Sequence, residues 1–100
     1  MFYSTSQKWN ITSDSRIIFL SNGNCIDAAI PKAGYPLLLY SVISQLSSSQ
    51  TWIIEPTPTN ATFILRSVGV PNLAMSLNGK TIYLANYNSS DTKQQWKITY

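Results

Sequence analysis

Histidine is absent from this chain, and cysteine occurs once, as Cys25. Without histidine, the Ser-His-Asp and Cys-His catalytic arrangements lack their general base, and zinc sites lose one of their two usual ligands. One cysteine can form neither an internal disulfide nor a cysteine cluster. The sequence therefore predicts a protein that is not an enzyme and that holds no metal or other cofactor.

Charged residues are also scarce, at 11% of the chain. The four acids are Asp14, Asp27, Glu55 and Asp91, and no two of them form a pair typical of general acid–base catalysis. Seven lysines and arginines give a net charge of +3, but they are scattered singly. Because nucleic-acid binding needs a clustered basic surface, we expect no nucleic-acid partner.

Long apolar runs are missing as well. The longest, residues 17–20 and 36–40, are far too short to span a bilayer, so we expect no membrane insertion. The first residues show neither a charged n-region nor an apolar h-region, so no signal peptide is visible. In a longer chain such a signal could lie upstream.

What the chain does contain favours one small all-β domain. Its 100 residues include 23 serines and threonines, and 12% are aromatic, a composition that suits strands better than helices. Asn78-Gly79 is the strongest two-residue hairpin signal. Short strands are expected at residues 16–20, 25–28, 37–42, 52–55, 62–67, 73–77, 82–86 and 96–99.

The three tryptophans reveal an internal repeat. Trp9, Trp52 and Trp96 are spaced by 43 and 44 residues, and each has a glutamine two places before it and an isoleucine two places after it. Tryptophan and isoleucine should point inward from one face of a strand, while the glutamine amide can tie the preceding turn to backbone groups. Four strands per repeat also fit a propeller blade, but a propeller needs at least four blades.

This pattern resembles the ricin-B-type lectins. The resemblance rests on Gln-x-Trp, on residues 22–28 (Asn-Gly-Asn-Cys-Ile-Asp-Ala) and on residues 36–40 (Pro-Leu-Leu-Leu-Tyr), in family order. It implies a β-trefoil of three four-stranded repeats. Residues 1–12 would be the tail of a first repeat, 13–55 the second and 56–100 the third. About nine of twelve strands are then present, so the remainder of a longer chain or a second copy would complete the barrel, unless the domain is a reduced variant.

The resemblance also implies a sugar site in the 13–55 repeat. Asp27 would accept hydrogen bonds from sugar hydroxyls, and Tyr40 would stack on the ring. Ser49 stands where the family has a longer amide donor, and Gln50 would orient Asp27. Residues 28–36 would form a wall of the pocket. Galactose- or xylose-type glycans are the implied partners.

Other readings of the same residues stay open. Asp27 could cap a turn, and Tyr40 could pack at the barrel rim. In the 56–100 repeat, Ser76 takes the place of the aspartate, and Leu84-Ala85 that of the aromatic residue, so that repeat should not bind sugar. The family's disulfide partner of Cys25 is replaced by Val42, so Cys25 should be a small buried hydrophobe.

The function predicted from the sequence is a non-catalytic carbohydrate-binding module, appended to a larger secreted enzyme or toxin. The alternative is a β-trefoil that binds proteins through its loops, as protease inhibitors do, and that has lost sugar binding.

Overall fold

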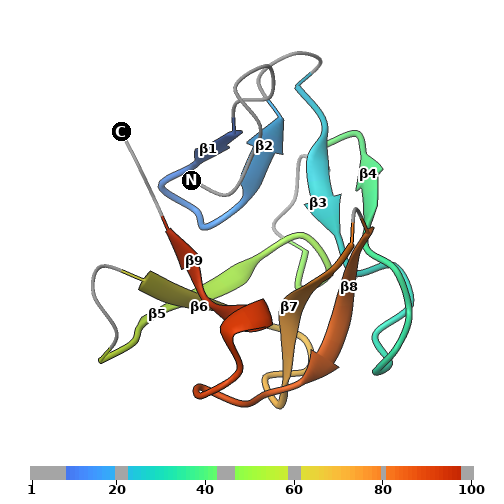
Figure 1. The fold of residues 1–100 in the computed structure, drawn as a ribbon. Coiled ribbons are helices and arrows are strands. Elements are labelled where there is room, and N and C mark those ends of the chain that lie inside the picture. The colour runs from blue at the N-terminus through green and yellow to red at the C-terminus, as the bar shows by residue number, and fades with distance from the viewer. Residues whose placement is uncertain (1–8, 20–22, 43–46, 59–61, 80, 98–100) are drawn as a thin grey trace.

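The structure, a computed structural model, describes residues 9–19, 23–42, 47–58, 62–79 and 81–97. In these ranges the chain forms nine short strands and one 3-10 turn, η1 (Thr92–Gln94), and no α-helix (Figure 1). All strand pairs are antiparallel. The all-β class predicted from the composition is confirmed.

The first sheet contains the strands β1 to β4 in chain order. Their bounds are β1 (Trp9–Ile11), β2 (Ile17–Phe19), β3 (Cys25–Asp27) and β4 (Leu38–Tyr40). Among the described residues β4 pairs with β3 alone, so its outer side is an edge of the sheet there.

The second sheet contains β5 to β8 in chain order, with β9 paired to β6. Their bounds are β5 (Trp52–Pro56), β6 (Thr62–Ser67), β7 (Leu73–Asn78), β8 (Thr81–Asn86) and β9 (Trp96–Lys97). The expected Asn-Gly hairpin joins β7 to β8, and Gly79 has a left-handed φ of 61° that a residue with a Cβ rarely adopts.

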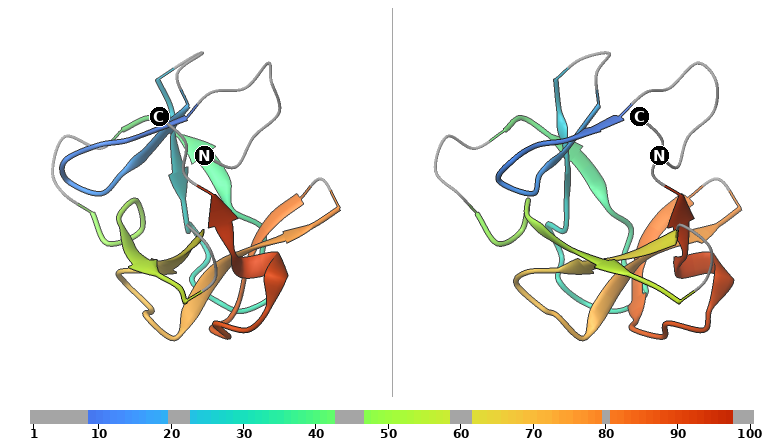
Figure 2. Two further views of the ribbon diagram at one scale, coloured as in Figure 1. Left: turned by 60° about the vertical axis from the view of Figure 1, so that its left-hand side comes forward. Right: turned by 90° about the vertical axis from the view of Figure 1, so that its left-hand side faces the viewer.

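The two sheets lie one above the other in both views of Figure 2, and a short segment of backbone links them. This bridging segment, residues 34–37, precedes β4 and runs antiparallel along β8. The Gly34 N–H donates to the carbonyl of Leu84 at 2.7 Å, and the Leu84 N–H donates to the carbonyl of Tyr35 at 3.0 Å. The chain between β3 and β4 is therefore fixed to the second sheet.

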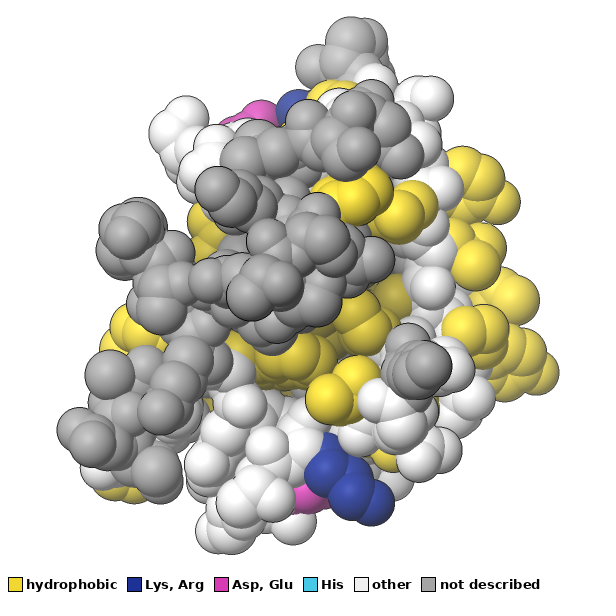
Figure 3. All heavy atoms as spheres, turned by 45° about the horizontal axis from the view of Figure 1, so that its top comes forward, with side chains coloured by type: hydrophobic (Ala, Val, Ile, Leu, Met, Phe, Trp, Pro, Cys, Tyr) yellow, Lys and Arg dark blue, Asp and Glu magenta, His cyan; other side chains and the backbone are white. Residues whose placement is uncertain are grey.

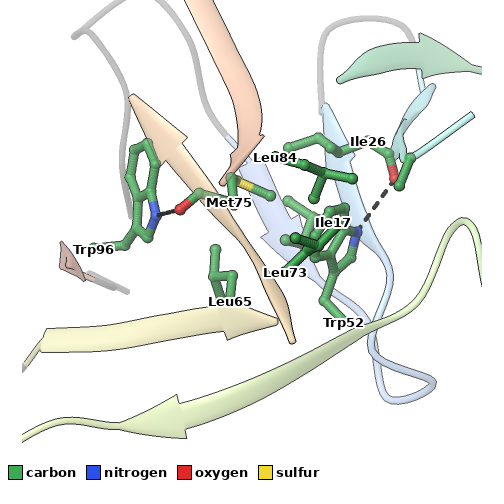
Figure 4. Packing of buried hydrophobic residues seen from close by; sticks show 9 residues of the cluster. Ile17, Ile26, Trp52, Leu65, Leu73, Met75, Leu84 and Trp96 are labelled. Carbon is green, nitrogen blue, oxygen red and sulfur yellow. Dashed lines mark hydrogen bonds between the residues drawn. The ribbon is translucent and has the colours of Figure 1, made fainter. Parts of the chain in front are cut away.

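Buried hydrophobic side chains from both sheets form one core (Figure 4). Trp52 is 1% exposed and Trp96 is 6% exposed, as the repeat predicts. Each indole also hydrogen-bonds a strand carbonyl, from Trp52 to Ile26 at 3.3 Å and from Trp96 to Met75 at 3.1 Å. The side chain of Trp9 lies outside the described part. The buried cluster consists of Ile17, Ile26, Ala28, Trp52, Leu65, Leu73, Met75, Leu84 and Trp96.

Two further expectations from the repeat are confirmed where the residues are described. The isoleucine after the tryptophan points inward, and the glutamine before it hydrogen-bonds backbone groups. Ile54 packs against the core while Ile53 is exposed, which is the alternation of a strand. Gln50 Nε2 donates to the carbonyl of Ser41 at 3.0 Å, and Gln94 Nε2 donates to that of Asn86 at 2.8 Å. Gln7 and Ile98 lie outside the described residues.

Every expected strand overlaps an observed one, with ends that differ by a few residues. The largest difference is at 37–42, where the strand is limited to β4 and all three of its residues are exposed. Residues 98 and 99 of the last expected strand lie outside the described part.

Candidate functional site

Asp27 ends β3 and is buried, with 5% of its surface exposed. A buried carboxylate needs hydrogen-bond donors, and Gln50 supplies one from Nε2 to Oδ2 at 3.1 Å. Because the same Nε2 also binds the Ser41 carbonyl, the amide is fixed at two points and the carboxylate is held in one orientation.

The second oxygen of Asp27, Oδ1, accepts no hydrogen bond from the described part of the chain. Asp27 keeps 5% of its surface exposed to solvent. Asp27 therefore keeps one oriented acceptor oxygen without a partner in the described part of the chain. This arrangement suits a ligand that donates hydrogen bonds from hydroxyl groups.

Tyr40 lies on the same face of the sheet as Asp27. In the register of β3 and β4, Tyr40 pairs with Cys25, and Leu38 pairs with Asp27. Directly opposed residues share a face, as do residues two apart on one strand. Tyr40 is thus the diagonal neighbour of Asp27, and it is 49% exposed. Its ring is therefore exposed on the face of the sheet to which Asp27 belongs.

Ser49 is half-buried in the turn before Gln50, and its hydroxyl lies 3.0 Å from that of Ser47. Its carbonyl accepts the N–H of Ala28 at 2.8 Å, so this turn is tied to the end of β3. The structure thus brings Asp27, Gln50 and Tyr40 to one place, with Ser49 beside them but already engaged with a neighbouring serine.

A hollow of about 200 Å³ lies beside this place, where the loop after β3 meets the turns before Gln50 and after β6. Part of the expected wall, residues 28–36, contributes to it through three residues. Neither Asp27 nor Tyr40 lines it. Its lining is Ala28, Ala29, Pro31, Ser48, Ser49, Ser67, Gly69 and Val70, which carry no charge.

Cys25 is fully buried and free, as the sequence predicts. Burial, with the charge of Asp27 nearby, raises the pKa of its thiol. The thiol therefore stays protonated at neutral pH and is a poor nucleophile. Val42, which stands at the family's disulfide position, is 40% exposed.

The strands fall into two similar sets, β2–β5 and β6–β9. The second set repeats part of the arrangement that surrounds Asp27 in the first. Because Ile26 and Met75 each accept an indole hydrogen bond, Ser76 corresponds to Asp27. Ala85 pairs with Ala74 as Tyr40 pairs with Cys25, so it occupies the aromatic position. The hydroxyl of Ser76 is buried and has no hydrogen-bond partner among the described residues.

Two features of the surface were not predicted. Leu38, opposite Asp27, is 38% exposed, and no alternation in its leucine run marks it as a surface residue. The other feature is a cluster on the second sheet. Arg66 binds Glu55 at 3.0 Å and lies 4.4 Å from the centre of the Tyr87 ring, while the Tyr87 hydroxyl donates to Glu55. The three residues of this cluster are 11 to 32 positions apart in the sequence, so no local motif predicts it.

The described ranges contain neither a metal-binding cluster nor a membrane-spanning helix. No group of three or more acidic or cysteine side chains stands close enough there to hold a metal ion. No helix in those ranges is long and apolar enough to cross a bilayer.

Comparison with known proteins relates the chain to a curated plant protein. No family model matches the chain. Over 99 residues, 97% of its length, the chain is 28% identical to volkensin of Adenia volkensii. The chain spans about a fifth of the length of that protein, or 18%. Together with the all-β fold, this similarity supports a relationship to the ricin-B-type lectins.

Proposed function

We propose that this chain is a non-catalytic carbohydrate-binding module with a β-trefoil fold. The observation that carries the proposal is the pair formed by Asp27 and Tyr40. A buried carboxylate, oriented by Gln50, keeps one oxygen free beside an exposed aromatic ring. Sugars present hydroxyl donors on their edges and C–H groups on their faces, and they match both parts of this pair. Galactose- and xylose-type glycans are the proposed ligands.

The module would belong to a larger secreted enzyme or toxin. The similarity to volkensin, of which this chain spans a small part, supports that context. Binding through one small site should be weak for a single chain, because such modules gain strength by multivalency.

Titration of the protein with galactose- and xylose-type oligosaccharides tests the proposal. Asp27→Asn keeps the size of the side chain but removes the charge of the acceptor, and it should weaken binding about tenfold or more. Tyr40→Ala should also weaken binding, whereas Tyr40→Trp should be tolerated because a ring face is kept.

The matched control is Asp91→Asn. Asp91 caps η1 by accepting the N–H of Lys93 at 2.9 Å. Its substitution removes the same charge as Asp27→Asn, but at a place outside β3 and β4. It should leave binding unchanged. A folded Asp27→Asn variant that binds as well as the parent would refute the carbohydrate site.

The pairing of the strands supports completion of the barrel by further chain. Among the described residues β1 pairs with β2 and β9 pairs with β6, while β1 and β9 do not pair with each other. We propose that the remainder of a longer chain, or a second copy, supplies the strands between them, because open strand edges bind other strands. Light scattering should then show self-association of the 100-residue chain, and a sharp monomer at high concentration would argue against it.

A second candidate function is protein binding by a trefoil that has lost sugar binding. The exposed apolar side chains of residues 30–42 favour it, because surface patches of this kind mark protein interfaces. The Asp27→Asn titration separates the two functions, since a protein-binding surface does not depend on one carboxylate that accepts sugar hydroxyls.

A further inference from the structure

Leu38 is the residue directly opposite Asp27 across the β3–β4 pair. Opposed residues on one face of an antiparallel sheet have Cβ atoms about 5 Å apart. Leu38 is 38% exposed, so a ligand bound at Asp27 meets an aliphatic side chain next to the carboxylate. Leucine neither donates nor accepts hydrogen bonds, and it contributes apolar contact alone.

The surroundings of Leu38 are apolar and nearly uncharged. Tyr40 follows it on the same face, and Lys32 is the one charged residue of the sequence from 28 to 54. In Figure 3, hydrophobic side chains gather along the right-hand side, where β4 and the loop before it lie. The exposed large hydrophobic residues of this region are Ile30, Tyr35, Leu38, Leu39, Tyr40 and Val42.

Pyranose chemistry restricts what can face such a residue. Carbons 2, 3 and 4 of the ring usually carry hydroxyl groups, and carbon 1 carries a hydroxyl or the glycosidic linkage. Carbon 5 is the position that carries a hydroxymethyl group, a methyl group or hydrogen. With hydroxyls bound to Asp27 and the ring face on Tyr40, the carbon-5 substituent is the group best suited to contact Leu38.

We infer that Leu38 gives this site a preference for sugars with a methyl group on carbon 5, the 6-deoxyhexoses, over sugars with a hydroxymethyl group. The inference rests on the proposed carbohydrate function and names the ligand class of that same site. A methyl group buries apolar surface against Leu38, whereas the hydroxyl of a hydroxymethyl group gains no partner from it.

Two series of sugars test this preference, each with a constant ring configuration. The galactose series is D-fucose, L-arabinopyranose and D-galactose, with methyl, hydrogen and hydroxymethyl on carbon 5. The glucose series is 6-deoxy-D-glucose, D-xylose and D-glucose. In the series that binds, the methyl sugar should bind about fourfold more tightly than the hydrogen sugar, the effect of burying one carbon. The hydroxymethyl sugar should bind no better than the hydrogen sugar.

Leu38→Gln places an amide opposite Asp27, which can hydrogen-bond a hydroxymethyl group. This variant should lose the methyl preference. The matched control is Leu39→Gln, the same change on the neighbouring residue. Leu39 pairs with Ile26 on the other face of the sheet and is 42% exposed, so its variant should keep the preference of the parent. Melting curves should show that both variants fold.

The outcomes separate the inference from the function on which it rests. Binding that depends on Asp27 but shows no methyl preference, or a preference that survives Leu38→Gln, overturns the role of Leu38 and leaves the carbohydrate site standing. Loss of the preference in Leu39→Gln also overturns it. No binding of any sugar in either series overturns both proposals.

Discussion

Ser76 occupies in the second set of strands the position that Asp27 occupies in the first. Each follows a residue whose carbonyl accepts an indole hydrogen bond, Met75 and Ile26 respectively. Both side chains are buried, but they differ in their hydrogen bonds. Asp27 accepts a hydrogen bond from Gln50, whereas the Ser76 hydroxyl has no partner among the described residues.

Ser76→Ala should therefore stabilise the protein or leave its stability unchanged. Removing a buried hydroxyl without a partner removes its desolvation penalty, about 1–3 kcal/mol at most. Ser67→Ala is the matched control, because Ser67 is equally buried but accepts the N–H of Val70 at 3.3 Å. Its variant should lose about 1 kcal/mol. Urea denaturation measures both, and equal losses would show that Ser76 is bonded in solution.

Gln50→Ala and Gln94→Ala should both lower the free energy of unfolding, by about 1–3 kcal/mol each, because each removes a fully buried amide and its hydrogen bond to a backbone carbonyl, that of Ser41 or of Asn86. The two variants should differ in ligand binding. Gln50 alone of the pair holds the Asp27 carboxylate, so Gln50→Ala should weaken sugar binding and Gln94→Ala should not. Thermal melts and titrations on the same samples check this, and equal binding losses would contradict the positioning role of Gln50.

Trp52→Ala should cost about 3–5 kcal/mol, since Trp52 is nearly fully buried in the shared core. Trp52→Phe should cost less, because it keeps most of the ring volume and loses the hydrogen bond to the Ile26 carbonyl. Chemical denaturation of both variants gives the comparison. A cost for Trp52→Phe equal to that of Trp52→Ala would mean that the hydrogen bond, and not the volume, dominates.

The Glu55 carboxyl should make stability sensitive to acid. The hydrogen bond from Tyr87, with the Arg66 guanidinium, lowers the pKa of Glu55 below its ordinary value of 4.5. The unfolded chain then binds the proton more readily than the folded one. The stabilisation is present above pH 4.5 and is lost as the pH falls through the lowered folded pKa.

Denaturation between pH 7 and pH 2 should show this loss in the parent protein. Tyr87→Phe removes the hydrogen bond and should reduce the acid dependence, while Glu55→Gln should remove the part that comes from this carboxyl. An unchanged pH profile in Glu55→Gln would show that the cluster does not persist in solution.

The sequence predicted the elements better than their edges. The tryptophans and isoleucines mark core strands because burial imposes an alternation that remains visible in the chain. The strand at 37–42 was predicted too long, because a run of leucines carries no alternation, and because β4 has a neighbour on one side and none of its residues is buried. Propensity cannot tell an edge strand from a central one.

For the candidate site, Asp27 and Gln50 were predicted from the resemblance to the ricin-B-type lectins, and a hydrogen bond across 23 residues joins their side chains. The resemblance did not point to Leu38, because facing Asp27 is a matter of pairing register and not of residue type. The Glu55, Arg66 and Tyr87 cluster was missed for a similar reason, since its members meet through the pairing of β5 with β6 and the turn after β8.

The bridging segment has a consequence for affinity. Because Gly34 and Tyr35 are bonded to the backbone of β8, the connection that leads into β4 loses its conformational entropy when the protein folds. A ligand at Asp27 and Tyr40 then does not need to order this connection when it binds. The ordering of loops is among the main costs of binding. If the proposed site binds sugar, this side of it is thus preorganised, and the affinity measured there should report the quality of the contacts themselves.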